Sequence, residues 1–329
     1  MTRTMDYGTI TGVRKPVARL VLGTMIISTG ERERSYRLLD DAFECGFTTL
    51  DTANVYAGGD SERCIGDWMR DRANRDQVVI VTKGAHPNAD RRRVTPYDIG
   101  ADILDSLARL KTDYIDIYLL HRDDLAVPVG EIVDALDEHY RAGRIRAYGG
   151  SNWTHTRLAD ANAYAETHDR APMVTSSPNY SLAEQVRDPW GDNSGSVSLS
   201  GPENIQARAW YTETQMPVLA WSSLARGFFA GRYTSKEFAE NANLLDGAAA
   251  RAYLHERNYL RLDRAFALAA EKNVTVAQIA MAYVLRDPMN VFPIVGAANR
   301  TELESNLTAA QIELSSDERA WLNLEVPEH

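Results

Sequence analysis

The chain has 329 residues, of which 44% are hydrophobic, enough to bury a large core. Its formal net charge of −10 disfavours binding to nucleic acid or to an anionic membrane surface. Two cysteines without metal-ligand spacing, an N-terminus without the apolar region of a secretion signal, and no stretch long enough for a membrane span predict a cytoplasmic protein.

An apolar segment and a helical pattern alternate eight times along the chain. The predicted strands cover residues 18–25, 48–53, 78–84, 114–121, 145–152, 173–180, 217–224 and 291–297. The predicted helices cover residues 34–45, 61–72, 95–111, 129–144, 154–168, 204–213, 248–285 and 301–310. Ser61 is the predicted N-cap of the second helix.

The strands are continuous apolar runs, which is typical of parallel strands covered on both faces. Eight strand–helix units in a chain of this length favour a closed (β/α)₈ TIM barrel forming one domain over residues 1–329. No G-x-G-x-x-G follows the first strand, so a Rossmann sheet lacks its main signature. We expect an N-terminal hairpin at residues 8–17 to close the bottom, and long loops at residues 181–204 and 226–246 on the C-terminal face.

Four chemically active side chains follow the second, third and fourth predicted strands. Asp51 and Tyr56 lie at and beyond the end of the second strand, Lys83 ends the third, and His121 ends the fourth. The C-terminal ends of barrel strands meet at one face, where barrel enzymes place their sites. We therefore expect a carboxylate, a phenol, an ammonium and an imidazole at a common site.

These four groups suit the protonation of a carbonyl oxygen while hydride reaches its carbon. A phenol has a pKa of about 10, too high for easy proton donation at neutral pH, and a nearby ammonium such as Lys83 lowers it. Asp51 would hold Lys83 and keep it charged, and His121 can donate a hydrogen bond to the substrate oxygen. The set predicts a reductase of aldehydes or ketones with Tyr56 as general acid.

Seven segments resemble the aldo-keto reductase superfamily in order and spacing over nearly the whole chain. They are LGTM, DTANVY, VTKG, LLHRDD, GGSNW, AWSSLARG and PIVGAANRTELESN. The chain looks more similar to the bacterial sugar- and stress-related branches and to potassium-channel β-subunits than to mammalian steroid and aldose reductases. The resemblance implies a (β/α)₈ barrel that reduces carbonyls with a nicotinamide cofactor and no metal, gives Asp51, Tyr56, Lys83 and His121 the roles above, and is compatible with a monomer or a homo-oligomer.

The resemblance also implies a set of cofactor-binding residues. Ser151 and Asn152 would hydrogen-bond the nicotinamide carboxamide, with Ser177 standing where a glutamine is usual. Trp221 would stack on the nicotinamide ring. The remaining members of the set follow the first, seventh and eighth strands: Gly23, Thr24, Ser222, Leu224, Gly227, Gly296, Ala297, Asn299, Arg300, Glu302 and Asn306.

NADP(H) is the cofactor that the resemblance favours, with NAD(H) as the alternative. Ala298 replaces a residue that often reaches the 2′-phosphate of NADP(H), and Glu302 places a carboxylate where Gln or Arg is usual. A carboxylate beside a phosphate is unfavourable. Arg300 is the nearby cation that would compensate.

The expected partner is a small carbonyl or alcohol substrate. Polar and aromatic residues near the strand ends favour a sugar-derived or other polar carbonyl over a steroid-like one. The candidate substrate residues are Met25, Ile26, Arg122, Asp123, Trp153 and Trp190.

Two other functions remain open from the sequence. One is a nucleotide-binding subunit that senses the redox state of its cofactor with little turnover. The other is a lyase or aldolase that uses Lys83 as a Schiff-base nucleophile, which requires a neutral lysine. Asp51 would keep Lys83 charged, so the second alternative is disfavoured.

Overall fold

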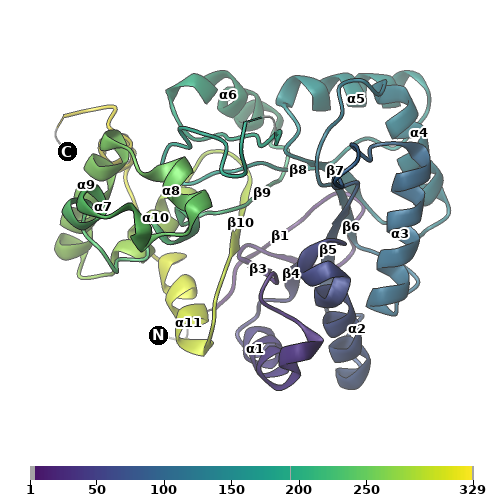
Figure 1. Cartoon of the computed structure of the whole chain (residues 1–329), viewed down its shortest axis with the longest axis horizontal. Coiled ribbons are helices and arrows are strands. Elements are labelled where there is room, and N and C mark those ends of the chain that lie inside the picture. The colour runs from purple at the N-terminus through teal and green to yellow at the C-terminus, as the bar shows by residue number, and fades with distance from the viewer. Residues whose placement is uncertain (1–3, 193, 328–329) are drawn as a thin grey trace.

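The computed structural model of the chain describes residues 4–192 and 194–327. In these residues eight parallel strands close into a barrel in the order β10-β3-β4-β5-β6-β7-β8-β9, and twelve α-helices accompany them. The helices surround the strands, with α3 to α5 on one side of the barrel and α7 to α10 on the other (Figure 1). The predicted (β/α)₈ TIM barrel is confirmed.

The strands are short and the helices are mostly three to four turns long. The barrel strands are β3 (Val21–Gly23), β4 (Thr49–Asp51), β5 (Val79–Gly84), β6 (Ile117–Leu120), β7 (Tyr148–Ser151), β8 (Thr175–Ser177), β9 (Val218–Ala220) and β10 (Val291–Val295). The helices are α1 (Arg32–Glu44), α2 (Asp60–Arg72), α3 (Pro96–Leu110), α4 (Val129–Arg141), α5 (His155–Thr167), α6 (Ile205–Thr214), α7 (Ser235–Glu240), α8 (Gly247–Tyr253), α9 (Glu256–Lys272), α10 (Val276–Leu285), α11 (Arg300–Ala309) and α12 (Ser316–Leu322).

The apolar residues of each strand divide between two layers because successive side chains point to opposite faces. One layer fills the barrel interior and includes Val79, Val81, Ile117, Leu119 and Phe292. Removing these side chains from water stabilises the barrel. The C-terminal end of the barrel, above this apolar layer, is left for polar groups.

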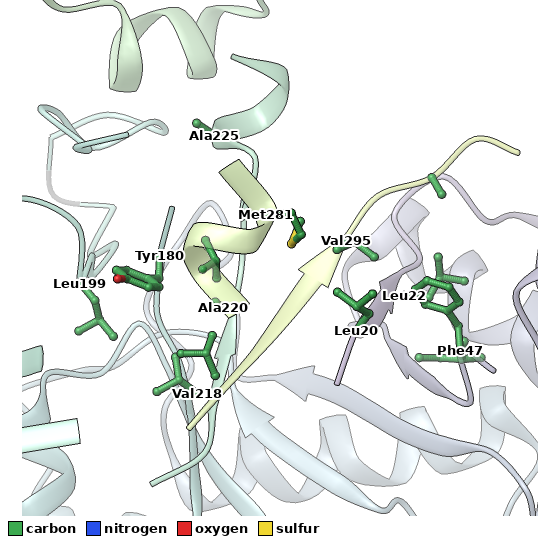
Figure 2. Close-up of a cluster of buried hydrophobic side chains, with 14 of the residues drawn as sticks. Leu20, Leu22, Phe47, Tyr180, Leu199, Val218, Ala220, Ala225, Met281 and Val295 are labelled. Carbon is green, nitrogen blue, oxygen red and sulfur yellow. The ribbon is translucent and has the colours of Figure 1, made fainter. Parts of the chain in front are cut away.

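The other layer lies between the strands and the helices. Leu22 and Val295 are paired in register on β3 and β10. Figure 2 shows them with Leu20, and with Phe47 nearby, in the cluster of buried side chains that joins the barrel wall to its helices.

The predicted N-terminal hairpin is confirmed as the antiparallel pair β1 (Tyr7–Gly8) and β2 (Val17–Ala18). Ile10 and Val17 belong to the same apolar cluster as the barrel interior. The Ala18 N–H also donates to Thr49 Oγ1 at 2.9 Å, at the start of β4. The hairpin therefore closes the end of the barrel opposite the strand C-termini.

Two local predictions are corrected. Helix α2 begins after Gly59, which is its N-cap with φ 86°, whereas Ser61 lies inside the helix. The Ser61 hydroxyl instead donates to the Thr24 carbonyl at 3.0 Å, so it joins α2 to the loop after β3. The long helical region predicted at residues 248–285 is divided into three helices, α8, α9 and α10.

No helix in residues 4–192 and 194–327 combines the length and the hydropathy needed to cross a bilayer.

Candidate active site

The period of two along each strand brings three of the predicted catalytic side chains into the barrel. Lys83 follows Val81 by two positions and His121 follows Leu119 by two, and both apolar residues face the interior. Asp51 ends β4 and is the backbone partner of Val81, so its side chain points to the same face as Val81. All three side chains are therefore aimed inward above the apolar layer, at the C-terminal end of the barrel.

Tyr56 comes from the loop after β4. It opens a 3₁₀ turn (η2, Tyr56–Gly59) in which Ala57 and Gly58 both have positive φ angles of 49° and 63°. This tight reversal returns the phenol over the barrel. The Tyr56 ring is half-buried and lies edge-on to the His121 ring, with centroids 5.9 Å apart.

Three of the four groups meet at Lys83, and His121 lies against the Tyr56 ring. The Lys83 Nζ lies 2.6 Å from Asp51 Oδ1, 2.9 Å from the Thr52 carbonyl oxygen and 3.4 Å from Tyr56 Oη. The structure thus brings together Asp51, Tyr56, Lys83 and His121, as the sequence predicts.

Burial and neighbouring charges set the protonation states of this cluster. Burial raises the pKa of Tyr56, and the Lys83 ammonium opposes only part of that shift, so the phenol keeps its proton at neutral pH. Lys83 does lower the pKa of Tyr56, as expected, but burial raises that pKa by more. Burial opposes the charge of Lys83 itself, yet the carboxylate of Asp51 holds the pKa of Lys83 above its usual range. Burial, helped by Lys83, holds the pKa of His121 well below its usual range, so the imidazole is neutral.

A cavity of about 1480 Å³ opens above these groups. It exceeds the roughly 300–1,000 Å³ of most small-molecule sites, so it has room for a long cofactor together with a substrate. Asp51, Tyr56, Lys83 and His121 line it. Most of the expected cofactor residues line it too: Gly23, Ser151, Asn152, Trp221, Ser222, Leu224, Gly227, Gly296, Ala297, Glu302 and Asn306.

The cavity wall fits a nicotinamide dinucleotide in two respects. Gly227 and Gly296 have open space where a Cβ would stand, so a ligand can approach their backbone closely. Trp221 presents a half-buried ring to the cavity, and its buried Nε1 has no hydrogen-bond partner among the described residues. An aromatic face and an open glycine-lined wall are what a flat ring and a pyrophosphate require.

Four of the expected cofactor residues do not line the cavity. Thr24 is buried and donates to the Asp51 carbonyl at 2.9 Å, and Ser177 is buried and donates to the Leu219 carbonyl at 2.7 Å. Asn299 caps α11 by accepting from the Glu302 N–H. These hydroxyl and amide groups are occupied within the fold.

Arg300 is the fourth of these residues. Its guanidinium pairs with Glu44 at 2.7 Å, Glu304 at 3.2 Å and Asp41 at 3.3 Å. Three carboxylates therefore already hold the cation that was expected to compensate for Glu302.

The candidate substrate residues divide into two groups. Met25, Ile26, Arg122 and Trp190 line the cavity, and Trp190 lies 5.1 Å from Trp221 between ring centroids. Asp123 and Trp153 do not line it.

Asp123 and Trp153 do not line the cavity because each is packed elsewhere in the fold. Asp123 pairs with Arg157 at 3.1 Å, behind the strand end. Trp153 has an exposed fraction of zero and donates from Nε1 to the Arg122 carbonyl at 3.4 Å. Trp153 is thus a core residue and cannot stack on a substrate.

Sequence reasoning missed several cavity residues. His86 lines the cavity with its ring 4.9 Å from the His121 ring, and its Nδ1 lies 2.8 Å from the Pro87 carbonyl oxygen. The sequence offered one indication that His86 belongs to the site, because it lies three residues after Lys83 in the loop leaving β5. Arg92, Arg226 and Arg232 also line the cavity.

The model of the aldo/keto reductase family matches residues 19–323. An uncharacterized oxidoreductase of Bacillus subtilis, YrpG, is 30% identical over 95% of this chain and 93% of its own length. An aryl-alcohol dehydrogenase [NADP(+)] of Phanerodontia chrysosporium is 29% identical over 92% of this chain and 78% of its own, and a norsolorinic acid reductase of Aspergillus flavus is 28% identical over 93% and 76%.

A solved structure gives the same result. The thermostable aldo-keto reductase Tm1743, in complex with the inhibitor epalrestat, superposes with a TM-score of 0.72 and 25% identity, covering 97% of this chain and 99% of that one. The chain belongs to the aldo/keto reductase family of oxidoreductases.

Proposed function

We propose that the protein is an NAD(P)H-dependent oxidoreductase that reduces an aldehyde or ketone to an alcohol by hydride transfer, with Tyr56 as general acid. One observation carries the proposal: the Tyr56 hydroxyl lies 3.4 Å from the Nζ of the buried Lys83, in the wall of a cavity large enough for cofactor and substrate.

The roles follow from charge and position. Ser151, Asn152 and Trp221 would hold a nicotinamide cofactor, which would supply or accept the hydride. Tyr56 donates its proton to the carbonyl oxygen, and the Lys83 ammonium stabilises the phenolate that remains. Asp51 holds the ammonium in place, and the neutral His121 donates a hydrogen bond to the same oxygen. In alcohol oxidation Tyr56 takes the proton back.

The named relatives support the reaction class. One relative is named an aryl-alcohol dehydrogenase and another a norsolorinic acid reductase, so their names cover the oxidation of an alcohol and a reduction. The polar lining contributed by Arg122, His86 and Arg92 favours a polar carbonyl substrate, and sugar-derived aldehydes belong to that class. The free thiols Cys45 and Cys64 suit a reducing cytoplasm.

NADP(H) is the preferred cofactor in this proposal, and NAD(H) is the second candidate. The relative named as NADP(+)-dependent supports NADP(H), and two arginines that line the cavity could face phosphate groups: Arg232, and Arg226, which is paired with Asp246 at 3.2 Å. Arg232 has no carboxylate within ion-pair distance in the described residues. Glu302 opposes a 2′-phosphate, and Arg300 is already paired.

Oxidation of NADPH and of NADH with 4-nitrobenzaldehyde tests this function. Turnover with either cofactor supports the reductase, and the ratio of the two rates measures the cofactor preference. Tight cofactor binding without turnover on a panel of aldehydes would favour the redox-sensing subunit instead. Absence of both binding and turnover would contradict the proposal.

A further inference from the structure

Arg122 is a buried cation in the wall of the active-site cavity. Its exposed fraction is 6%, and it directly follows His121 at the end of β6. Its Nη1 donates to the His121 carbonyl at 2.9 Å, and its Nε donates to the Ser194 carbonyl at 3.1 Å. The Trp190 ring lies against the guanidinium, 5.1 Å from the ring centroid. These contacts fix the guanidinium in one orientation.

No carboxylate within the described residues lies at ion-pair distance from Arg122. The acid whose charge acts on it is Asp188. The oxygens of Asp188 accept hydrogen bonds from Ser194 Oγ at 2.6 Å and from the backbone N–H groups of Trp190 and Ser196. Burial lowers the pKa of Arg122, and Asp188 compensates only in part. A buried guanidinium without a counterion is costly, so a ligand that supplies the counterion binds favourably there.

The guanidinium retains donors for such a ligand. Arginine has five N–H donors, and two of them are used in contacts with His121 and Ser194. The remaining N–H groups lie on Nη1 and Nη2, the edge suited to a bidentate oxyanion. Arg92 lines the same part of the cavity, and within the described residues it also lacks an ion pair.

The charge lies on the substrate side of the cavity. Arg122 follows β6 by two residues, and β6 is four strands from β10 in either direction around the closed barrel. The expected cofactor residues Gly296, Ala297 and Glu302 follow β10, so the two groups occupy opposite sides of the opening. The Arg122 guanidinium is bonded to the backbone of His121, so a group bound to it lies next to the carbonyl that His121 and Tyr56 would contact.

Given the proposed carbonyl reduction, we infer that the substrate carries an anionic group, a carboxylate or a phosphate, which Arg122 binds while the carbonyl oxygen meets Tyr56 and His121. Trp190 covers one face of the guanidinium, so the anion would reach Arg122 along its Nη1–Nη2 edge. Arg92 adds a second positive charge at the entrance.

Matched substrate pairs test this inference. One pair is 4-carboxybenzaldehyde and 4-carbamoylbenzaldehyde, and the other is glyceraldehyde 3-phosphate and glyceraldehyde. The native protein is expected to prefer the anionic member of at least one pair by about 10- to 100-fold in kcat/KM, the range of a charged hydrogen-bonded contact. The pair that shows the preference identifies the anionic group.

The variants Arg122→Gln and Arg122→Lys separate charge recognition from a structural role. Arg122→Gln is expected to bring the anionic-to-neutral ratio near one, and Arg122→Lys to restore part of it. Arg170→Gln removes a surface arginine paired with Asp134 at 2.7 Å and is expected to leave the ratio unchanged. No preference in either pair, or an equal loss on both members of a pair in Arg122→Gln, would overturn the inference.

A binding measurement keeps this inference distinct from the proposed reaction. Benzoate and benzamide are titrated against the protein, and quenching of Trp190, identified with Trp190→Phe, reports occupancy next to Arg122. Benzoate is expected to bind at least 10-fold more tightly than benzamide in the native chain but not in Arg122→Gln. Equal binding would overturn the inference even if neutral aldehydes are reduced, whereas selective benzoate binding without turnover of any aldehyde would contradict only the proposed reaction.

Discussion

The Lys83 ammonium lies 2.6 Å from the Asp51 carboxylate, and each side chain is only 3% exposed. Removing one member of such a buried pair leaves the other charge uncompensated, at a cost of about 3–5 kcal/mol. We therefore expect Asp51→Asn and Lys83→Met each to lower the free energy of unfolding by an amount in that range. Urea denaturation of the two variants measures this.

The double variant Asp51→Asn with Lys83→Met is the control for this prediction. It removes both charges together, so its loss of stability is expected to be smaller than the sum of the two single losses. Strictly additive losses would show that the two groups do not interact. Carbonyl reduction is expected to fall in all three variants.

The suppressed pKa of His121 predicts a dependence of stability on pH. In the unfolded chain a histidine has a pKa of about 6.5, whereas burial and Lys83 hold the pKa of His121 well below that in the fold. Below pH ~6.5 the unfolded state therefore binds a proton that the folded state refuses, and stability falls as the pH falls. The stability that His121 contributes is fully present above pH ~6.5.

His121→Asn removes this contribution. The variant is expected to lose less stability between pH ~6.5 and pH ~5 than the native chain, by up to ~1.4 kcal/mol per pH unit. Urea unfolding at a series of pH values measures the difference. His168→Asn changes an exposed histidine and serves as the comparison. An identical acid dependence in His121→Asn and the native chain would refute the prediction.

Glu302 is expected to weaken binding of a 2′-phosphate. It lines the cavity and accepts from the Ala298 N–H at 2.8 Å, so its carboxylate is held at the opening of α11. Because the side chain is half-buried, solvent screens part of the repulsion. Glu302→Gln is expected to raise the NADPH-to-NADH ratio of kcat/KM by about 10-fold.

The cofactor prediction has a matched comparison. Glu313→Gln changes an exposed carboxylate paired with Arg286, outside the cavity, and is expected to leave the ratio unchanged. Steady-state rates with both cofactors, at low and high salt, measure the NADPH-to-NADH ratio of kcat/KM in each variant. A ratio unaffected by Glu302→Gln would show that residue 302 does not face the phosphate.

The N-terminal hairpin is expected to contribute stability without contributing to chemistry. Ile10 is 2% exposed and packs into the apolar barrel interior, at the end opposite Asp51. Ile10→Ala removes buried methyl groups and leaves a cavity, which costs about 2–5 kcal/mol. Thermal or urea unfolding is expected to show that loss, while kcat at moderate temperature stays close to the native value. A large drop in kcat with intact folding would contradict this separation.

The sequence was sufficient for the barrel and for the four groups around Lys83. The alternation of side chains along a strand and the place where a strand ends can both be read locally. Because Val81 and Leu119 face the barrel interior, Lys83 and His121, each two positions later, are expected to point inward as well. The break within residues 248–285 was also readable, since Thr275 and Gln278 form a capping box at the start of α10. That signal was overlooked within a long helical pattern.

The contacts that loop side chains make could not be predicted from such local patterns. Asp123 pairs with Arg157, and Arg300 pairs with Glu44, a residue far away in the chain. Such partners are determined by the packing of helices on the barrel, which no local pattern specifies. The same holds for Trp153, whose type fits a substrate platform as well as a core position.

The rate of NADPH oxidation with 4-nitrobenzaldehyde, compared between the native chain and Tyr56→Phe, tests the central claim most directly. Loss of the phenol is expected to lower kcat by about 10²- to 10⁴-fold, the usual contribution of a general acid, while cofactor affinity stays within a few-fold. Tyr97→Phe, which changes a tyrosine that is 81% exposed, is expected to leave kcat unchanged. Undiminished turnover in Tyr56→Phe would contradict the mechanism.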